Sequence, residues 1–179
     1  MPGADRPEQA RVHRAGVLEA RVGDLLPEIR LPATSGREVN LMAESRRGHL
    51  VLFFYPGDRD GLRFPELSGC TAEACSFRDH ATQIRALGAE IFGISTGTIA
   101  RQRAFVERED LAFELLSDPQ HHLIDRLGIP LWRSEGGEEF VSRTTFVVRR
   151  GGRIATIFED VAVPRHLDAV LVAVSSLES

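Results

Sequence analysis

Lysine is absent from this chain of 179 residues, so all 22 basic side chains are arginines. Without lysine, the protein cannot form a lysine Schiff base with a carbonyl substrate, and it cannot supply the lysine of a phosphate-binding P-loop. Arginine stays charged at every working pH, so these side chains act as fixed charges and hydrogen-bond donors. The absence therefore excludes two large classes of enzyme.

A strong charge imbalance and long apolar segments are also missing. The formal net charge is −4, and residues of both signs are mixed along the chain, which argues against a surface built for nucleic acid. No apolar run approaches the roughly 20 residues of a membrane-spanning helix, and the N-terminus lacks the apolar segment of a secretory signal. We therefore expect a cytoplasmic protein that binds neither nucleic acid nor a membrane.

Cysteine is scarce, with only Cys70 and Cys75. In a reducing compartment, two closely spaced thiols are more often catalytic or metal-binding than structural. A zinc site would need about two more ligands, and His80, His121 and His122 do not form a recognised spacing, so we expect no metal. The alternative is that both are merely small buried residues, because free cysteine is among the most buried residue types.

The composition indicates one globular domain. It is 42% hydrophobic and 27% charged, and the chain is long enough to bury a sizeable core without a disulfide. Residues 1–16 are rich in proline, glycine, arginine and acidic residues without periodicity, so we predict a flexible N-terminal extension. We expect residues 17–179 to form the single domain.

The pattern of apolar residues predicts an α/β fold. Residues 51–55 and 89–96 are apolar enough for strands buried on both faces, and Gly151-Gly152 indicates a hairpin turn. The remaining predicted elements are strand 26–32 with residues 39–41 as the second arm of a hairpin, helix 99–110, strand 113–116, helix 121–127, strands 143–150 and 153–159, and helix 165–177. This order predicts a mixed sheet, parallel in its first half and completed by an antiparallel hairpin.

The two cysteines lie on a predicted helix that starts near Gly69 and continues to Gly88, with an apolar face that includes Phe77. Five residues of ideal helix separate two alpha carbons by about 8 to 9 Å. A disulfide requires at most about 7 Å. The pair can therefore be bridged only if the first turn unwinds, which suits a reversible redox reaction better than a permanent cross-link.

The helix start predicts unequal roles for the two thiols. Cys70 follows Gly69, where unpaired backbone N–H groups and the helix dipole favour a negative charge, so we expect its pKa to be below the usual value of about 8.5. Cys75 is better placed to attack an oxidised Cys70 than to be attacked first, because a sulfenic acid condenses with a neighbouring thiol.

Other polar and aromatic side chains near the cysteines are weaker candidates. Glu73 and Arg78 lie close to the cysteines along the helix. Their spacing fits a solvated or salt-bridged helix face as well as it fits a role in the active site. Trp132 and Phe140 could line a substrate surface, although single aromatic residues usually contribute to packing.

The sequence around the cysteines resembles that of the peroxiredoxins, and more narrowly that of the bacterioferritin comigratory protein (PrxQ) subfamily. The resemblance is carried by residues 51–56 and by the run Gly-Cys-Thr-Ala-Glu-Ala-Cys-Ser-Phe-Arg-Asp at 69–79. It extends over most of the chain, through segments 22–24, 92–96, 115–118 and 143–147. The combination of these segments is specific for the subfamily, although each segment alone is not.

This resemblance implies a thioredoxin-like fold and a peroxidase without metal or organic cofactor. Cys70 matches the peroxidatic cysteine, which becomes a sulfenic acid, and Cys75 matches the resolving cysteine of an intrachain disulfide. Arg143 matches the arginine near the thiolate, where it can stabilise negative charge. The implied partners are a peroxide substrate and thioredoxin or a similar dithiol reductant. The implied assembly is a monomer or a weak homodimer.

The segment before Cys70 departs from the family pattern. Pro56 occupies the place of the family's proline, but it lies fourteen positions before Cys70 instead of seven. The family's threonine or serine falls at Leu67, which has no hydroxyl, and Ser68 could replace it. We therefore take Pro56, Ser68 and Gly69 as the candidate substrate-binding residues.

The extra residues also suggest a substrate preference. Leu62, Phe64, Pro65 and Leu67 could form an apolar rim that favours organic peroxides, or the segment could be an inert loop or an oligomer contact.

Two rival functions stay open. A thioredoxin-like disulfide oxidoreductase is disfavoured because the chain has no Cys-x-x-Cys motif. A redox-responsive binding domain on the same fold would use disulfide formation to alter a partner surface.

Overall fold

A five-stranded mixed sheet forms the centre of the computed structural model, which describes residues 11–12, 20–57, 69–133, 137, 139–159 and 163–178. Its strands, in spatial order, are β10 (Ile154–Glu159), β9 (Thr144–Val148), β4 (His49–Phe54), β5 (Ala89–Ser95) and β6 (Glu114–Ser117). The pairs β4/β5 and β5/β6 are parallel, whereas β9 is antiparallel to both β4 and β10. The predicted mixed sheet and its closing hairpin are confirmed.

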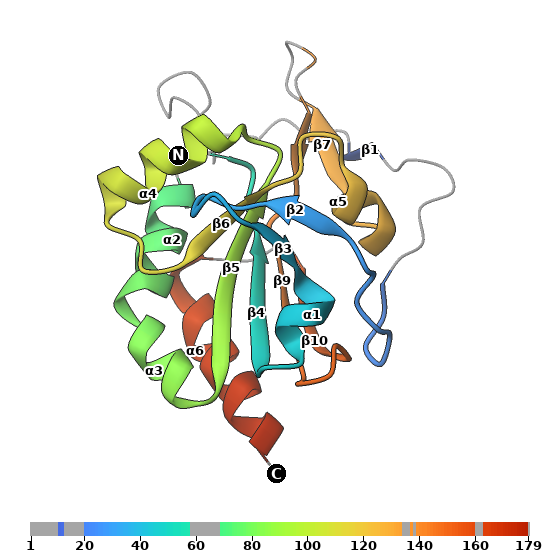
Figure 1. Ribbon diagram of the computed structural model, residues 1–179, viewed down its shortest axis with the longest axis vertical. Helices are drawn as coiled ribbons and strands as arrows, with labels where there is room; N and C mark the ends of the chain where they lie inside the picture. The colour runs from blue at the N-terminus through green and yellow to red at the C-terminus, as the bar shows by residue number, and fades with distance from the viewer. Residues whose placement is uncertain are drawn as a thin grey trace, which may run out of the picture.

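Helices cover both faces of this sheet, which is why β4 and β5 are apolar at nearly every position (Figure 1). On one face lie α2 (Gly69–Asp79), α3 (Ala81–Ala86), α4 (Ile99–Glu109) and α6 (Val163–Ser175), followed by a short 3₁₀ turn, Ser176–Glu178. On the other lie α1 (Leu41–Ser45), α5 (His122–Leu127) and the hairpin of β2 (Arg30–Pro32) with β3 (Glu38–Asn40). Successive side chains of β4 therefore enter two separate apolar cores.

The helix that carries the cysteines is shorter than predicted. We expected one helix to Gly88, but it is interrupted at His80 (φ −112°, ψ 9°), which separates α2 from α3. The ring Nδ1 of His80 lies 3.0 Å from the carbonyl oxygen of Ser76. Phe77 and Ile84 are buried on either side of the interruption, so the apolar periodicity does not reveal it.

We did not predict α1, which begins where we expected the strand at 39–41 to continue. The Asn40 side chain accepts hydrogen bonds from the backbone N–H groups of Met42 and Ala43, at 3.0 and 3.3 Å, and this N-cap starts the helix.

A second, small sheet was also not predicted. It contains β1 (Arg11–Val12), β7 (Leu131–Arg133) and β8 (Glu139–Val141). β1 pairs with β7, so Arg11 and Val12, which belong to the predicted N-terminal extension, contact the body of the protein. The other residues of the 1–16 stretch lie outside the described residues, and the domain boundary at residue 17 stays a prediction.

Candidate active site around Cys70

The first cysteine lies where α2 begins, beside the carboxyl end of β4. Cys70 is only 2% exposed and belongs to the same apolar core as Tyr55 and Phe77. Gly57, two residues after Tyr55, donates a backbone hydrogen bond to the Cys70 sulfur. Gly57 has a φ of 122°, a backbone conformation that favours glycine.

A single guanidinium links the thiol to an acid. Arg143 lies immediately before β9, and its Nη2 donates to Cys70 Sγ at 3.1 Å while its Nη1 donates to Glu73 Oε2 at 2.5 Å. Cys70 and Glu73 are three residues apart on α2, so they share one face of the helix and one guanidinium can reach both. The structure thus brings together two predicted residues, Cys70 and Arg143, that are far apart in the sequence.

Burial controls the acidity of the Cys70 thiol. It raises the pKa of Cys70, whereas the charge and hydrogen bond of Arg143 and the N–H of Gly57 act in the opposite direction, and the charge of Glu73 raises the pKa slightly further. Our expectation of a lowered pKa was therefore wrong, because we considered the helix start but not the apolar core around it. Any thiolate formed here depends on Arg143 and Gly57.

Glu73 is a member of this site rather than of a solvated face. Its side chain is 2% exposed, and burial raises its pKa to about 7, against the opposing effect of Arg143. Its Oε1 is buried without a hydrogen-bond partner among the described residues. A carboxyl three residues after the cysteine was the available sequence signal, but burial was not visible in that spacing.

The second cysteine has a different environment. Cys75 is partly buried, and its Sγ lies 3.5 Å from Oε2 of Glu109, the last residue of α4. Arg78 donates to the backbone carbonyl of Glu109 at 2.6 Å. Both cysteines are free thiols in an intact helix, and we had not predicted the Glu109 contact, since nothing in the sequence relates residue 75 to residue 109.

The predicted substrate-binding residues fall into two groups. Pro56 is buried and, with the adjacent Gly57, lines a cavity of about 10 Å³ that also borders Ser95 and Gln102, and Gly69 is the first residue of α2. Ser68 lies outside the described residues, as do all four residues of the suggested apolar rim, Leu62, Phe64, Pro65 and Leu67.

The two aromatic candidates have different outcomes. Phe140 is fully buried in the core, and the side chain of Trp132 lies outside what the structure describes.

The described parts of the chain show neither a membrane span nor a metal-binding cluster. None of the helices there is long and apolar enough to span a membrane. In the same parts of the chain, no group of three or more His, Cys, Asp or Glu side chains is arranged to hold a metal ion.

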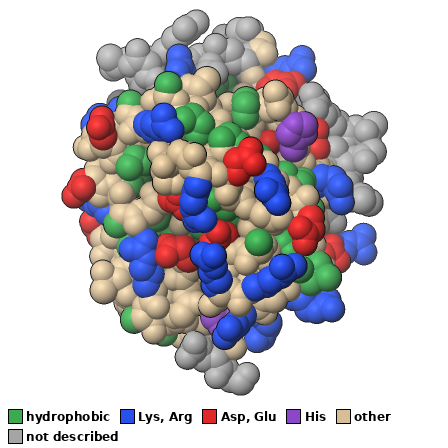
Figure 2. Space-filling view, viewed as in Figure 1, with side chains coloured by type: hydrophobic (Ala, Val, Ile, Leu, Met, Phe, Trp, Pro, Cys, Tyr) green, Lys and Arg blue, Asp and Glu red, His purple; other side chains and the backbone are tan. Residues whose placement is uncertain are grey.

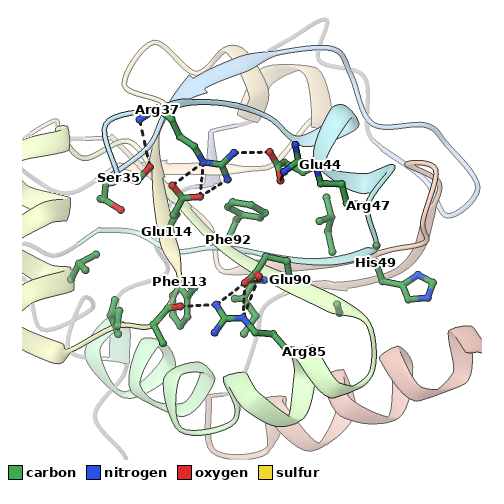
Figure 3. Close-up of a pocket in the computed structure, with 18 of the residues that line it drawn as sticks. Ser35, Arg37, Glu44, Arg47, His49, Arg85, Glu90, Phe92, Phe113 and Glu114 are labelled. Carbon is green, nitrogen blue, oxygen red and sulfur yellow. Dashed lines mark hydrogen bonds and ion pairs between the residues drawn. The ribbon is translucent and has the colours of Figure 1, made fainter.

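A much larger cleft lies elsewhere, at the amino ends of β4 and β5. It has a volume of about 1020 Å³ and does not include either cysteine. Figure 3 shows Phe92 between two ion-pair clusters, one around Arg37 and one around Arg85. Arginines and acids are intermingled on the face shown in Figure 2. Side chains of both signs therefore line the cleft, so neither charge dominates. The cleft is also separate from the two thiols.

Comparison with known families identifies the fold and the class of enzyme. Residues 22–157 match the AhpC/TSA family. The chain belongs to this family. It is a peroxiredoxin of the Bcp/PrxQ type, a thiol peroxidase, and the predicted family resemblance and peroxidase class are confirmed.

Among its relatives is Peroxiredoxin Bcp of Escherichia coli, 31% identical over 153 residues, which covers 84% of this chain and 93% of the relative. Peroxiredoxin Bcp of Bacillus subtilis is 30% identical over 86% of this chain and 94% of its own length. The solved structure of Peroxidoxin BcpB from Mycobacterium tuberculosis is 31% identical, with a TM-score of 0.76 over 88% of this peroxiredoxin and 98% of that chain. These matches confirm the predicted thioredoxin-like fold.

Proposed function

We propose that Cys70 is the peroxidatic cysteine of this peroxiredoxin, with hydrogen peroxide or an organic hydroperoxide as substrate. The observation that carries the proposal is the hydrogen bond from Arg143 to the sulfur of a buried cysteine at the start of a helix. In the reaction, the Cys70 thiolate attacks one peroxide oxygen and the O–O bond breaks. The sulfur becomes a sulfenic acid, and the other oxygen leaves with a proton as water or an alcohol.

The surrounding groups support this step electrostatically. Arg143 and the N–H of Gly57 are directed at the sulfur, and negative charge moves from this sulfur to the departing oxygen as the reaction proceeds. Donors that are fixed in place within a buried site act strongly on such a charge because little water screens them. We assign Arg143 as a catalytic residue, and Pro56, Ser68 and Gly69 stay the proposed substrate-binding positions.

We assign Cys75 as the resolving cysteine. Its thiol condenses with the Cys70 sulfenic acid, so that a disulfide forms and water leaves. Both thiols are part of an intact α2, which supports the requirement that the helix unwinds before the sulfurs meet. Thioredoxin or a similar dithiol would then reduce the disulfide, in a reducing compartment such as the cytoplasm.

The proposal is tested by peroxide consumption with a thioredoxin system, in the native chain and in the variants Cys70→Ser and Cys75→Ser. We expect Cys70→Ser to abolish turnover, whereas Cys75→Ser should still undergo one oxidation per chain. If the native protein consumes no peroxide and Cys70 forms no sulfenic acid, the assignment is wrong. Reduction of a disulfide substrate without any peroxidase activity would instead support the oxidoreductase alternative.

A further inference from the structure

Glu109 connects α2 to the end of α4 through two separate contacts. Its carboxylate Oε2 lies 3.5 Å from Cys75 Sγ, and its backbone carbonyl accepts a hydrogen bond from Arg78 at 2.6 Å. The other carboxylate oxygen, Oε1, accepts from Arg108 at 2.8 Å. Cys75 and Arg78 are three residues apart, so both contacts hold the same side of α2.

The charge state of Glu109 decides the direction of the bond to sulfur. The hydrogen bond from Arg108 is the largest effect that lowers the pKa of Glu109, so this residue is a carboxylate at neutral pH. A carboxylate only accepts hydrogen bonds, so the Cys75 S–H must be the donor. The contact therefore requires Cys75 to be a protonated thiol.

The other groups facing Cys75 do not reverse this result. Burial raises the pKa of Cys75, the charge of Arg78 opposes it, and Glu109 and then Asp79 raise the pKa further. Arg78 is itself paired with Asp79 at 2.9 Å.

We propose that Glu109 is a positioning residue that holds Cys75 as a protonated thiol and fastens α2 to α4, so that resolution begins only when this attachment opens. The proposal rests on the assignment of Cys75 as the resolving cysteine. It identifies a residue on a different helix as the control of the step between sulfenic acid and disulfide.

The attachment affects a competition between two fates of the sulfenic acid. In one, Cys70 S–OH and Cys75 S–H give the disulfide, and the hydroxyl and the thiol proton leave together as water. In the other, a second peroxide oxidises the sulfenic acid to a sulfinic acid before Cys75 arrives. Because Cys75 must first leave Glu109, the attachment slows the first fate and gives the second more time.

The charge effect is tested in a chain with one thiol, Cys70→Ser, by following the alkylation rate of Cys75 with iodoacetamide from about pH 6 to about pH 10. In this background Glu109→Gln should shift the midpoint of the profile to lower pH and raise the rate near neutral pH about two- to fivefold, as expected for the loss of one partly exposed charge. Arg78→Gln should shift the midpoint to higher pH. Glu107→Gln removes an exposed acid from the same helix and should leave the midpoint unchanged.

The attachment itself is tested in the chain with both cysteines, by the rate of disulfide formation after one equivalent of peroxide. Glu109→Gln and Arg78→Gln should both accelerate it about two- to fivefold, although their effects on the alkylation midpoint are opposite. They should also lower the yield of Cys70 sulfinic acid at high peroxide. A merely structural disturbance would not produce opposite shifts in the alkylation profile.

Two results would overturn the inference. One is an alkylation midpoint for Glu109→Gln equal to that of Glu107→Gln, which would show that the carboxylate does not hold the thiol protonated. The other is an unchanged rate of disulfide formation in both attachment variants. If the native chain forms neither sulfenic acid nor disulfide, the proposed function fails, whereas the alkylation profile still decides the role of Glu109.

Discussion

The two cysteines share one helix but form hydrogen bonds with groups of opposite charge. Cys70 is buried and lies 3.1 Å from a guanidinium nitrogen of Arg143, whereas Cys75 is partly exposed and lies 3.5 Å from a carboxylate oxygen of Glu109. Burial raises the pKa of both thiols, so burial does not distinguish them. The charge of the hydrogen-bond partner does, since it is a guanidinium at Cys70 and a carboxylate at Cys75. A cation favours attack at the first sulfur, and an anion keeps the second sulfur protonated.

Removing the cation should break this comparison most strongly. Arg143→Met deletes the donor to Cys70, and we expect the reaction with peroxide to slow about 10²- to 10³-fold, the usual cost of losing one donor to a developing charge. Stopped-flow measurement of Cys70 oxidation checks this. Arg126→Met, which removes an exposed arginine of α5, is the control. A loss of less than about tenfold would show that Arg143 is not the main stabiliser.

Glu73 sharpens the comparison because its charge opposes that of Arg143. Its pKa is raised to about 7 from 4.5, so the folded state binds more protons than the unfolded state between these values, and stability is lost as pH rises toward 7. Glu73→Gln should remove this loss. Relative to the variant, the native chain should become less stable by about 1 to 3 kcal/mol between pH 5 and pH 8.

Urea unfolding of both chains at the two pH values measures this difference. Because the comparison uses the change in stability between two pH values, any pH-independent effect of the substitution on stability cancels. Equal pH dependence in the two chains would mean that Glu73 does not titrate in this range.

His166 extends the comparison to the side of α2 that faces α6. It is buried against Phe77, and burial lowers its pKa to about 4 from 6.5, so the unfolded state binds more protons in this range. Stability is therefore present above pH 6.5 and lost as pH falls toward 4, the opposite slope to that of Glu73. His166→Gln should reduce the loss of unfolding free energy between pH 6.5 and pH 4.5 by about 1 to 2 kcal/mol. Urea unfolding at these two pH values measures it.

The large cleft at the other end of the sheet should give the smallest effect. Glu114→Gln weakens the ion pair with Arg37, whose side chain is 43% exposed, and exposed pairs contribute about 0 to 1 kcal/mol. We expect a change in unfolding free energy of this size and no change in peroxide turnover. A clear loss of turnover with unchanged stability would connect the two ends of the sheet and contradict their separation.

Local patterns predicted the elements whose cause is local. Residues 51–55 are apolar at every position and residues 89–96 at most positions, because both faces of β4 and β5 are covered, and Gly151-Gly152 closes the β9–β10 hairpin. The interruption at His80 was missed because the apolar positions continue on both sides of it. The small sheet was missed because β1 and β7 are too short to show a period of two.

The sequence by itself determined the family, the mixed sheet and the pair of cysteines on one helix, because periodicity and spacing are properties of neighbouring residues. Only the tertiary structure decided the charge that each sulfur faces. Arg143 and Glu109 reach Cys70 and Cys75 from a strand end and a helix end that are distant in the sequence. The burial that raises both pKa values likewise comes from packing against such distant elements, and no spacing along α2 contains it.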